Sequence, residues 1–334
     1  MPSRCRVGDR DGRGGWTYRP VRCRRPRRRT RRLGVAGQGA AGSGGVTLVA
    51  AGDLACAADE RKGVRRCAHD RTARLAEQLD PAAVLLLGDI QYPAGSPEDF
   101  AEEGGYTGTW SRLLDRTFPV PGNHEWRESG AAGYRQIFHQ RTGGLPYYSR
   151  EVGDWHLVAL DSSCDDVGGC DVDSPQVRWL RADLAAADGR PTIVMWHHPR
   201  HSSGEHGNER DVDDLWEVSV GDPDVQVVLN GHDHDYERWH RMDAEGEPTT
   251  AGARQFVVGT GGRSHYCSDG ERDSRSAVFD CSSFGVLALT LSLRRLRLAL
   301  PRSDRELHGR RPQRTAPAAG IVLTSADGRT RTSP

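Results

Sequence analysis

Residues 225–238, VQVVLNGHDHDYER, constrain this chain more than any other stretch. They begin with a short apolar, β-branched run of the kind found in buried strands, and Gly231 ends that run. His232 and His234 follow two positions apart, a spacing that directs both imidazoles to one side of an extended or tightly turned segment. A polar loop after a strand has a similar composition, but two neighbouring imidazoles suit a pair of adjacent metal ions, one histidine for each.

The same arrangement occurs at four other places in the chain. In each, an apolar segment leads to a Gly or Pro that permits a tight turn, beside a carboxylate, amide, imidazole or phenol. The motifs are GDLA (52–55), GDIQY (88–92), GNHE (122–125) and WHHP (196–199), with EHG (205–207) after the last. All of these groups offer oxygen or nitrogen and none offers a thiolate, which favours metals such as Fe, Zn or Mn.

The order of the apolar segments indicates an α/β fold. Besides the strand at 225–230, we expect strands at residues 46–51, 82–87, 117–121, 155–161, 192–196, 255–258 and 284–300. Helices are expected at 70–79, 175–187 and 211–220, the second of them capped by Ser174 before Pro175. Strands that alternate with helices, bracketed by strand-rich ends, predict a layered α/β sandwich. Functional loops in such folds gather at the carboxyl ends of the strands, where all five motifs lie.

The charges separate an N-terminal segment from the rest of the chain. Residues 1–32 hold thirteen Arg against Asp9 and Asp11, a net of +11, so a chain of zero net charge leaves −11 for the remainder. We predict that residues 1–44 are disordered, that 45–300 form one folded domain and that 301–334 are a poorly ordered tail. The arginines could attract polyanions nonspecifically, but the acidic body argues against a specific nucleic-acid partner.

Six of the eight cysteines fall into three local pairs: Cys56 with Cys67, Cys164 with Cys170, and Cys267 with Cys281. Their Gly- and Asp-rich surroundings predict disulfides, with buried free thiols as the alternative, and hence a secreted protein. Residues 33–45 are too rich in Gly for the apolar part of a signal peptide, so secretion is inferred from the cysteines alone. No apolar run approaches the roughly 20 residues of a membrane helix, and no membrane association is expected.

Taken in order, the motifs GD, GDxxY, GNH[DE], a histidine of the His-x-Pro type, and GHxH resemble those of the metallophosphoesterase (calcineurin-like) superfamily. Within it, they are most similar to the purple acid phosphatases and their bacterial relatives, over roughly residues 46–295. The resemblance implies a four-layer α/β/β/α sandwich with mixed sheets. It also implies two metal ions: one held by Asp53, Asp89, Tyr92 and His234, the other by Asn123, His197, His232 and the bridging Asp89.

Tyr92 bears on the identity of the metals. General members of the superfamily have Asp-x-His in the first motif, whereas this chain has Ala55 at the third position. Purple acid phosphatases also lack that histidine and use the tyrosine of GDxxY in its place. A phenolate from Tyr92 favours Fe(III), which would be paired with Fe(II), Zn or Mn.

The remaining histidines receive different roles. His124 and His206 are predicted to act on the substrate, because an imidazole that titrates near neutrality can protonate a leaving group or stabilise its charge. For His206 the likeness supports this, since mammalian-type purple acid phosphatases have a substrate-contacting histidine there. His198 is expected to support the ligands, and His201 is expected at the surface.

The likeness implies hydrolysis of phosphate monoesters by a hydroxide that bridges the two metals. A phosphodiesterase acting on nucleotides or phospholipid head groups is the alternative enzyme, with loops 93–115 and 200–212 deciding between them. A noncatalytic metal- or phosphate-binding protein is the third hypothesis. The expected partner is a small-molecule phosphoester, and the sequence does not indicate an oligomeric state.

Overall fold

The structure is a computed structural model that describes residues 5–10, 16–21, 45–63, 65–268, 270–292, 295–297, 320–324 and 330–331. Contacts within the chain divide it into two units, Met1–Ala41 and Gly42–Pro334. In the first unit, β1 (Cys5–Arg10) pairs with β2 (Trp16–Val21) as an antiparallel hairpin. The second unit carries the candidate site.

One mixed sheet of the second unit is organised around three parallel strands, β3 (Val46–Ala51), β4 (Ala83–Leu87) and β5 (Thr117–Val120). β13 (Phe284–Ser292) runs antiparallel to β3 on the other side. The sheet continues through β15 (Gly320–Thr324) and β16 (Thr330–Arg331), and β14 (Arg295–Arg297) also pairs with β13.

The other mixed sheet has four parallel strands, β7 (Trp155–Ala159), β8 (Thr192–Met195), β9 (Val225–Asn230) and β11 (Ala253–Val258). Antiparallel strands flank them, with β6 (Tyr148–Val152) beside β7 at one edge. At the other edge lie β10 (Tyr236–Met242) and β12 (Ser276–Asp280).

The two sheets pack face to face because alternate residues of each strand point to opposite sides. Leu48 and Ala50 of β3 join a shared core with residues of β7, β8 and β9, whereas Val49 and Ala51 face the helices on the outer side. That outer layer comprises α1 (His69–Gln78), α2 (Pro97–Ala101), η1 (Trp110–Arg116) and α4 (Ala132–Thr142), with the short α3 (Asn123–Trp126) and η2 (Ser129–Ala131) preceding α4.

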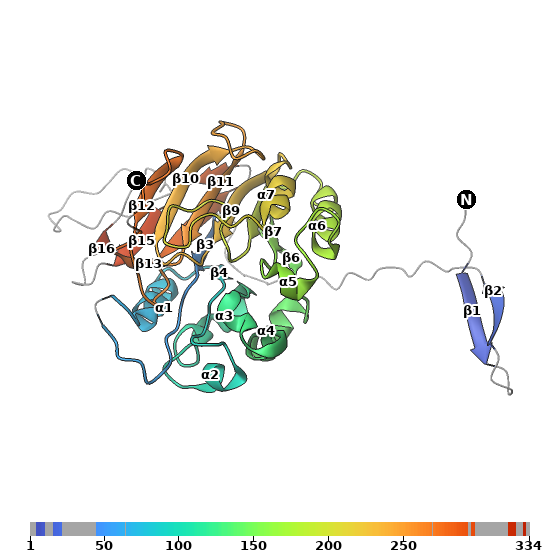
Figure 1. The fold of residues 1–334 in the computed structure, drawn as a ribbon, viewed down its shortest axis with the longest axis horizontal. Helices are drawn as coiled ribbons and strands as arrows, with labels where there is room; N and C mark the ends of the chain where they lie inside the picture. The colour runs from blue at the N-terminus through green and yellow to red at the C-terminus, as the bar shows by residue number, and fades with distance from the viewer. Residues whose placement is uncertain are drawn as a thin grey trace. The chain divides into compact units, whose positions relative to one another are not determined.

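On the far face of the second sheet, α6 (Pro175–Ala186) and α7 (Asp213–Val220) form the other outer layer, and α5 (Cys164–Val167) follows β7. Figure 1 shows α1 to α4 gathered on one side of the strands and α6 and α7 on the other. The side chain of Ser174 accepts a hydrogen bond from the Val177 amide, as the predicted cap requires. The predicted four-layer α/β/β/α architecture with mixed sheets is confirmed.

Some elements differ from the sequence-based expectation. The single strand expected at 284–300 is β13 followed by β14. Strand β10 was not predicted, and a register shift after Arg238 explains this, because the bulge interrupts the alternation of apolar residues. Of the segments predicted to be disordered or poorly ordered, 1–44 and 301–334, the structure describes only β1, β2, β15 and β16, and the rest lies outside the described residues. The run GIVLT at 320–324 is β-branched enough to pair with β13 despite its polar surroundings.

Candidate metal centre

The predicted ligands meet at the carboxyl ends of the parallel strands of both sheets. Asp53 follows β3, Asp89 follows β4 and Asn123 follows β5, while His197 follows β8 and His232 follows β9. Three of these residues have left-handed backbone conformations: Asp53 (φ 58), Asp89 (φ 48) and His232 (φ 75). Such conformations cost an L-residue roughly 1–2 kcal/mol, and they persist where the surroundings hold the residue for a purpose.

Glycine precedes Asp89 for a steric reason. Gly88 has a φ of +88, and a Cβ at this position would lie 2.4 Å from the Nδ1 atom of His197. Only glycine lets the end of β4 approach the end of β8 this closely. The GD motif therefore brings the two sheets together at the site.

Four side-chain atoms form a first ligand group. The Oη atom of Tyr92 lies 3.2 Å from Asp53 Oδ1, 3.0 Å from Asp89 Oδ2 and 3.1 Å from His234 Nε2. Asp53 Oδ1 and His234 Nε2 are 3.3 Å apart, and all four residues are buried. Two ligand atoms about 2.1 Å from one ion and at right angles to each other are about 3.0 Å apart. The spacing and the donor types therefore fit one metal ion.

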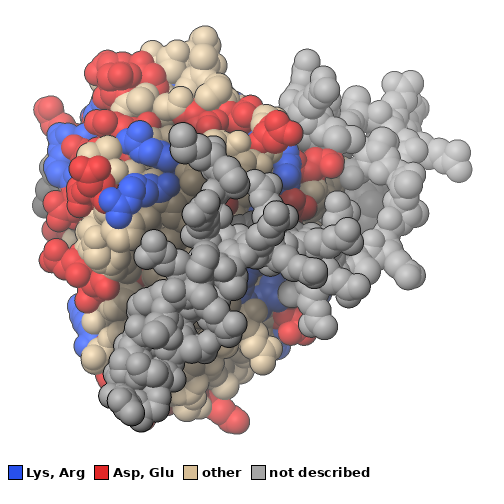
Figure 2. Space-filling model, turned by 90° about the vertical axis from the view of Figure 1, so that its right-hand side faces the viewer, with Lys and Arg blue, Asp and Glu red and all other residues tan. Residues whose placement is uncertain are grey.

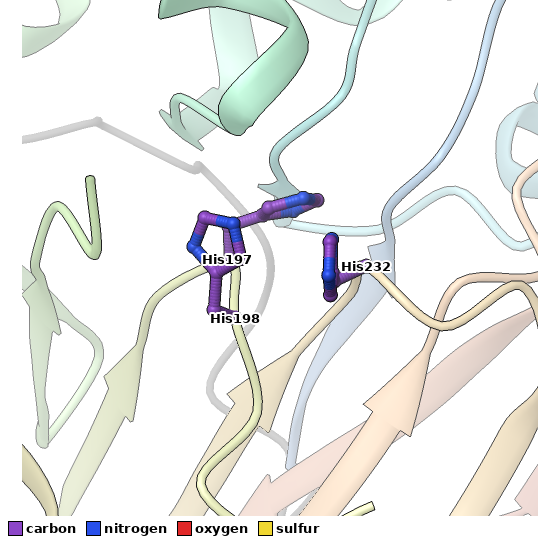
Figure 3. A group of neighbouring side chains, drawn as sticks. All are labelled: His197, His198 and His232. Carbon is purple, nitrogen blue, oxygen red and sulfur yellow. The ribbon is translucent and has the colours of Figure 1, made fainter. Parts of the chain in front are cut away.

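A second group lies beside the first. The Nε2 atom of His197 is 3.1 Å from Asn123 Oδ1 and 3.5 Å from Asp89 Oδ1. The ligand atoms of His197, His198 and His232 lie within 4.8 Å of one another, as do those of Asp53, Asp89 and His197. Figure 3 shows the three imidazoles converging from the ends of two neighbouring strands. These atoms fit a second ion.

Asp89 faces both groups. Its Oδ2 atom contacts Tyr92 of the first group, and its Oδ1 atom contacts His197 of the second. A carboxylate can bind one ion through each oxygen. The structure therefore brings all seven predicted ligand residues together, with Asp89 between the two sets.

Backbone and hydroxyl partners orient the imidazoles. The Nδ1 atom of His197 lies 2.8 Å from the carbonyl oxygen of Leu87. Because a carbonyl can only accept, Nδ1 carries the proton and Nε2 keeps a free lone pair for a metal. The Nδ1 atom of His234 lies 2.8 Å from Ser264 Oγ, which leaves its Nε2 facing Tyr92.

The electrostatics of the bare site favour cations. Burial alone would raise the pKa of Asp89, but its electrostatic and hydrogen-bond interactions with the neighbouring His197 and His124 hold it well below its usual range. Burial, together with the carboxylates of Asp89 and Asp53, raises the pKa of the Tyr92 phenol well above its ordinary value. Without a nearby metal ion the phenol therefore stays protonated, and a phenolate there requires a strongly charged cation.

The two histidines predicted to act on the substrate both border the ligand groups. The ring of His124 lies 4.1 Å from the ring of Tyr92, its Nδ1 atom is 2.5 Å from the Pro93 carbonyl oxygen, and its Nε2 atom lies 3.8 Å from Asp89 Oδ2. The exposed ring of His206 lies 4.3 Å from that of His232.

Tyr266 was missed by the sequence reasoning. Its hydroxyl lies 2.8 Å from His206 Nε2, and its ring stacks on His234 with centroids 4.7 Å apart. Tyr266 and Ser264 belong to the loop after β11, which is parallel to β9. Only the placement of that loop at the same edge of the sheet could have drawn attention to them.

His198 lies beside the ligands, with its ring centroid 4.8 Å from that of His197 and 4.5 Å from that of His232, and its Nδ1 atom is 2.8 Å from Ser162 Oγ. The prediction that His201 lies at the surface is wrong, since only 3% of it is exposed. Its ring packs against Trp216 and Trp239, with centroids 4.9 and 5.5 Å away. The loop after β8 turns inward because Asp233 accepts hydrogen bonds from the Ser202 hydroxyl and from the His206 amide.

The three predicted disulfides, Cys56–Cys67, Cys164–Cys170 and Cys267–Cys281, are all present. Paired cysteines are typical of proteins that mature in oxidising compartments. Within the described part of the chain, no helix is both long and apolar enough to span a membrane.

Comparison with known proteins places this geometry in a family. The sequence model of the calcineurin-like phosphoesterase family matches residues 46–236. Purple acid phosphatase 22 of Arabidopsis thaliana is 34% identical over 122 residues, which are 35% of this chain and 27% of that protein. A 3',5'-cyclic-nucleotide phosphodiesterase of Nostoc sp. is 28% identical over 186 residues, 52% of this chain and 65% of that one.

A purple acid phosphatase from yellow lupin (Lupinus luteus) seeds has a similar fold, with a TM-score of 0.62 at 16% identity over 98% of this chain and 58% of that one. The chain thus spans only part of the length of these relatives. The family match covers more than half of the chain and includes all the predicted metal ligands. We conclude that this chain belongs to the calcineurin-like phosphoesterase family.

Proposed function

We propose that the chain is a binuclear metal-dependent hydrolase of phosphate monoesters. The observation that carries this proposal is the position of Asp89, whose two oxygens face two separate sets of ligand atoms. One set contains Tyr92, His234 and Asp53, and the other contains His197, Asn123 and His232. A single structural carboxylate would not need two such sets.

The ligand residues and the two histidines beside them would have different functions. Ions held by these residues would supply two things: a lower pKa for a water molecule that could then act as the nucleophile, and positive charge to offset that of the phosphate. Tyr92, as a phenolate ligand, would favour Fe(III) in the first group, and Fe(II), Zn or Mn would occupy the second. His124 and His206 each have a ring at the edge of the ligand groups, where a proton or a positive charge can be given to the departing oxygen.

A phosphodiesterase is the second candidate, and the similarity to a cyclic-nucleotide phosphodiesterase favours it. Both reactions use the same metal centre, so the ligands do not separate them. The separating experiment measures kcat/KM of the metal-loaded protein on 4-nitrophenyl phosphate and on bis(4-nitrophenyl) phosphate. Preference for the monoester supports our proposal, whereas preference for the diester replaces it with the second candidate.

A noncatalytic metal- or phosphate-binding role is the third candidate. The intact set of seven ligand residues argues against it, because a protein that only binds phosphate does not need Asp89 between two sets. Failure of the metal-loaded protein to release phosphate or alcohol from either ester would favour this third role.

We propose a small-molecule phosphoester as the partner and no specific nucleic acid. On the uncovered part of the face drawn in Figure 2, blue Lys and Arg side chains lie beside acidic ones. Nucleic-acid binding that resists added salt would contradict this proposal, since nonspecific contacts weaken steeply with salt.

We further propose that the protein is secreted, on the strength of the three disulfides, and that residues 45–300 form its catalytic domain. Removing residues 1–44 should leave the melting temperature and kcat/KM unchanged. A large loss in either quantity would show that the segment belongs to the working enzyme.

A further inference from the structure

A cavity of about 340 Å³ adjoins the second ligand group. Its walls come from three parts of the chain: the segment beginning at α3, the segment after β7 and the loop between β8 and α7. Asn123 and His198 lie in the cavity wall and also in the second ligand group. If a phosphate is bound at the metal pair, as the proposed function requires, its alcohol therefore has this cavity as a neighbour.

The size of the cavity limits what it can hold. A water molecule takes about 30 Å³ of liquid volume, so the cavity offers room for roughly eleven groups of that size. This is at the lower end of the about 300–1,000 Å³ of small-molecule sites. It has room for the alcohol of a small ester.

The charge of the cavity wall is strongly one-sided. Four carboxylates, those of Asp165, Asp166, Glu209 and Asp211, stand against one guanidinium, that of Arg127, for a formal net charge of −3. Across the described residues, none of these four carboxylates forms an ion pair with Arg127 or with another cation. Arg127 donates instead to the carbonyl oxygen of Pro93, at 3.2 Å.

The carboxylates do not themselves form a metal site. Among the described residues, the groups of side chains close enough to hold an ion include none of these four acids. Asp165, Asp166 and Asp211 are exposed, so their charges act on whatever enters the cavity from solvent. Their effect is on the substrate's alcohol, because the phosphate itself would lie among the ligands.

We propose that this acidic cavity is the alcohol-binding pocket and that it selects phosphoesters of small uncharged or cationic alcohols. Choline and ethanolamine represent the favoured class. Alcohols that carry further negative charge, such as hydroxy acids or the remainder of a nucleoside polyphosphate, are repelled by the unpaired carboxylates. The inference rests on the proposed function for its placement of the phosphate.

The first test compares three esters of similar size: phosphocholine, glycerol phosphate and phosphoglycolate, whose alcohols are cationic, neutral and anionic. The measured quantity is the ratio of kcat/KM for phosphocholine to that for phosphoglycolate, in the wild type and in a variant with Asp165→Asn and Asp166→Asn. Comparing the ratio between proteins removes the intrinsic reactivity of the two esters. The matched control carries Glu103→Gln and Glu245→Gln, two exposed acids outside the cavity wall.

We expect the ratio to fall by about tenfold in the cavity variant, since two nearby charges act through a partly screened medium. The control variant should keep the wild-type ratio within about twofold on the same grounds. Asp211→Asn, on a different segment of the wall, should lower the ratio by a smaller factor. Ratios that stay the same in both cavity variants would overturn the proposal.

The second test does not depend on turnover. Choline and glycolate are each titrated into the metal-free protein while the indole N–H resonance of Trp126, a residue of the cavity wall, is followed by NMR. Choline should shift that resonance in the wild type and shift it less in the cavity variant. An equal or larger response to glycolate would overturn the proposal. Absence of turnover on all three esters, with choline binding intact, would instead count against the proposed function.

Discussion

Replacing Asp89 by Asn tests whether one carboxylate serves both ligand groups. The change preserves the size of the side chain and removes its charge. Because Oδ2 faces Tyr92 at 3.0 Å and Oδ1 faces His197 at 3.5 Å, both metal ions should bind more weakly. A ligand that belonged to one ion alone would weaken only that ion.

The expected magnitude follows from the linkage between metal binding and folding. At a free metal concentration 100 times Kd, each ion stabilises the folded protein by about 2.7 kcal/mol, and two ions by about 5.4 kcal/mol. Loss of residues that merely support ligands costs about 10–100-fold in affinity, so Asp89→Asn should cost about 100-fold or more at each position. Each ion then contributes about 0.4 kcal/mol.

Calorimetry of the metal-free and metal-loaded proteins measures this difference. With about 2–4 °C in Tm for each kcal/mol in a domain of this size, metal should raise the Tm by about 11–22 °C in the wild type and about 2–3 °C in Asp89→Asn. Tyr92→Phe should lose about half of the rise, because Tyr92 contacts one group only.

Asp161→Asn is the matched control. Asp161 is a fully buried carboxylate that accepts the indole N–H of Trp126 at 3.1 Å and belongs to neither ligand group. Its substitution should leave the metal-dependent rise intact, whatever it does to the Tm of the metal-free protein. A full rise in Asp89→Asn, or an equal loss in Tyr92→Phe and Asp89→Asn, would refute the bridging role.

Three further predictions concern neighbouring residues. His124→Ala and His206→Ala should keep the metal-dependent rise in Tm, while kcat should fall by about 10²–10⁴-fold. The fall should be smaller for nitrophenyl esters, because their leaving group needs no proton. Variants that have lost their metal ions would contradict this prediction. Tyr266→Phe should lower kcat because His206 is then poorly positioned, and adding Tyr266→Phe to His206→Ala should not lower kcat further. Additive losses of kcat in the double variant would instead give Tyr266 a role separate from His206. Burial raises the pKa of Asp161 to about 7, above its unfolded value near 4. The wild type should therefore lose stability relative to Asp161→Asn as pH rises from about 4 to about 7, as measured by denaturant unfolding. A difference in stability that does not change with pH would contradict the raised pKa.

The ligand set was predictable because its chemistry depends on local sequence. A strand, a glycine and a carboxylate or imidazole occupy a few consecutive residues, and parallel strands place such turns at one edge. The structure brings Asp53, Asp89 and His232 together as that reasoning expects. Each lies in a turn after its strand and has a left-handed backbone conformation.

Residues that act through long-range packing were not predictable in the same way. Tyr266 contacts His206, which lies 60 residues earlier in the sequence. No pattern in the sequence around Tyr266 predicts that contact. His201 is buried because two tryptophans from different elements close over it. The acidic cavity likewise combines residues around positions 165 and 210, and only the second lies in a loop expected to shape the substrate pocket.

Our main proposal is that the site holds two metal ions that make the protein a phosphoesterase. Its most direct test is metal analysis of the purified protein, combined with phosphate release from a monoester before and after chelation and reconstitution. We expect two ions per chain, loss of activity when they are removed, and its return when they are restored. Full hydrolytic activity in protein stripped of metal, or a fully reconstituted protein that holds one ion, would contradict it.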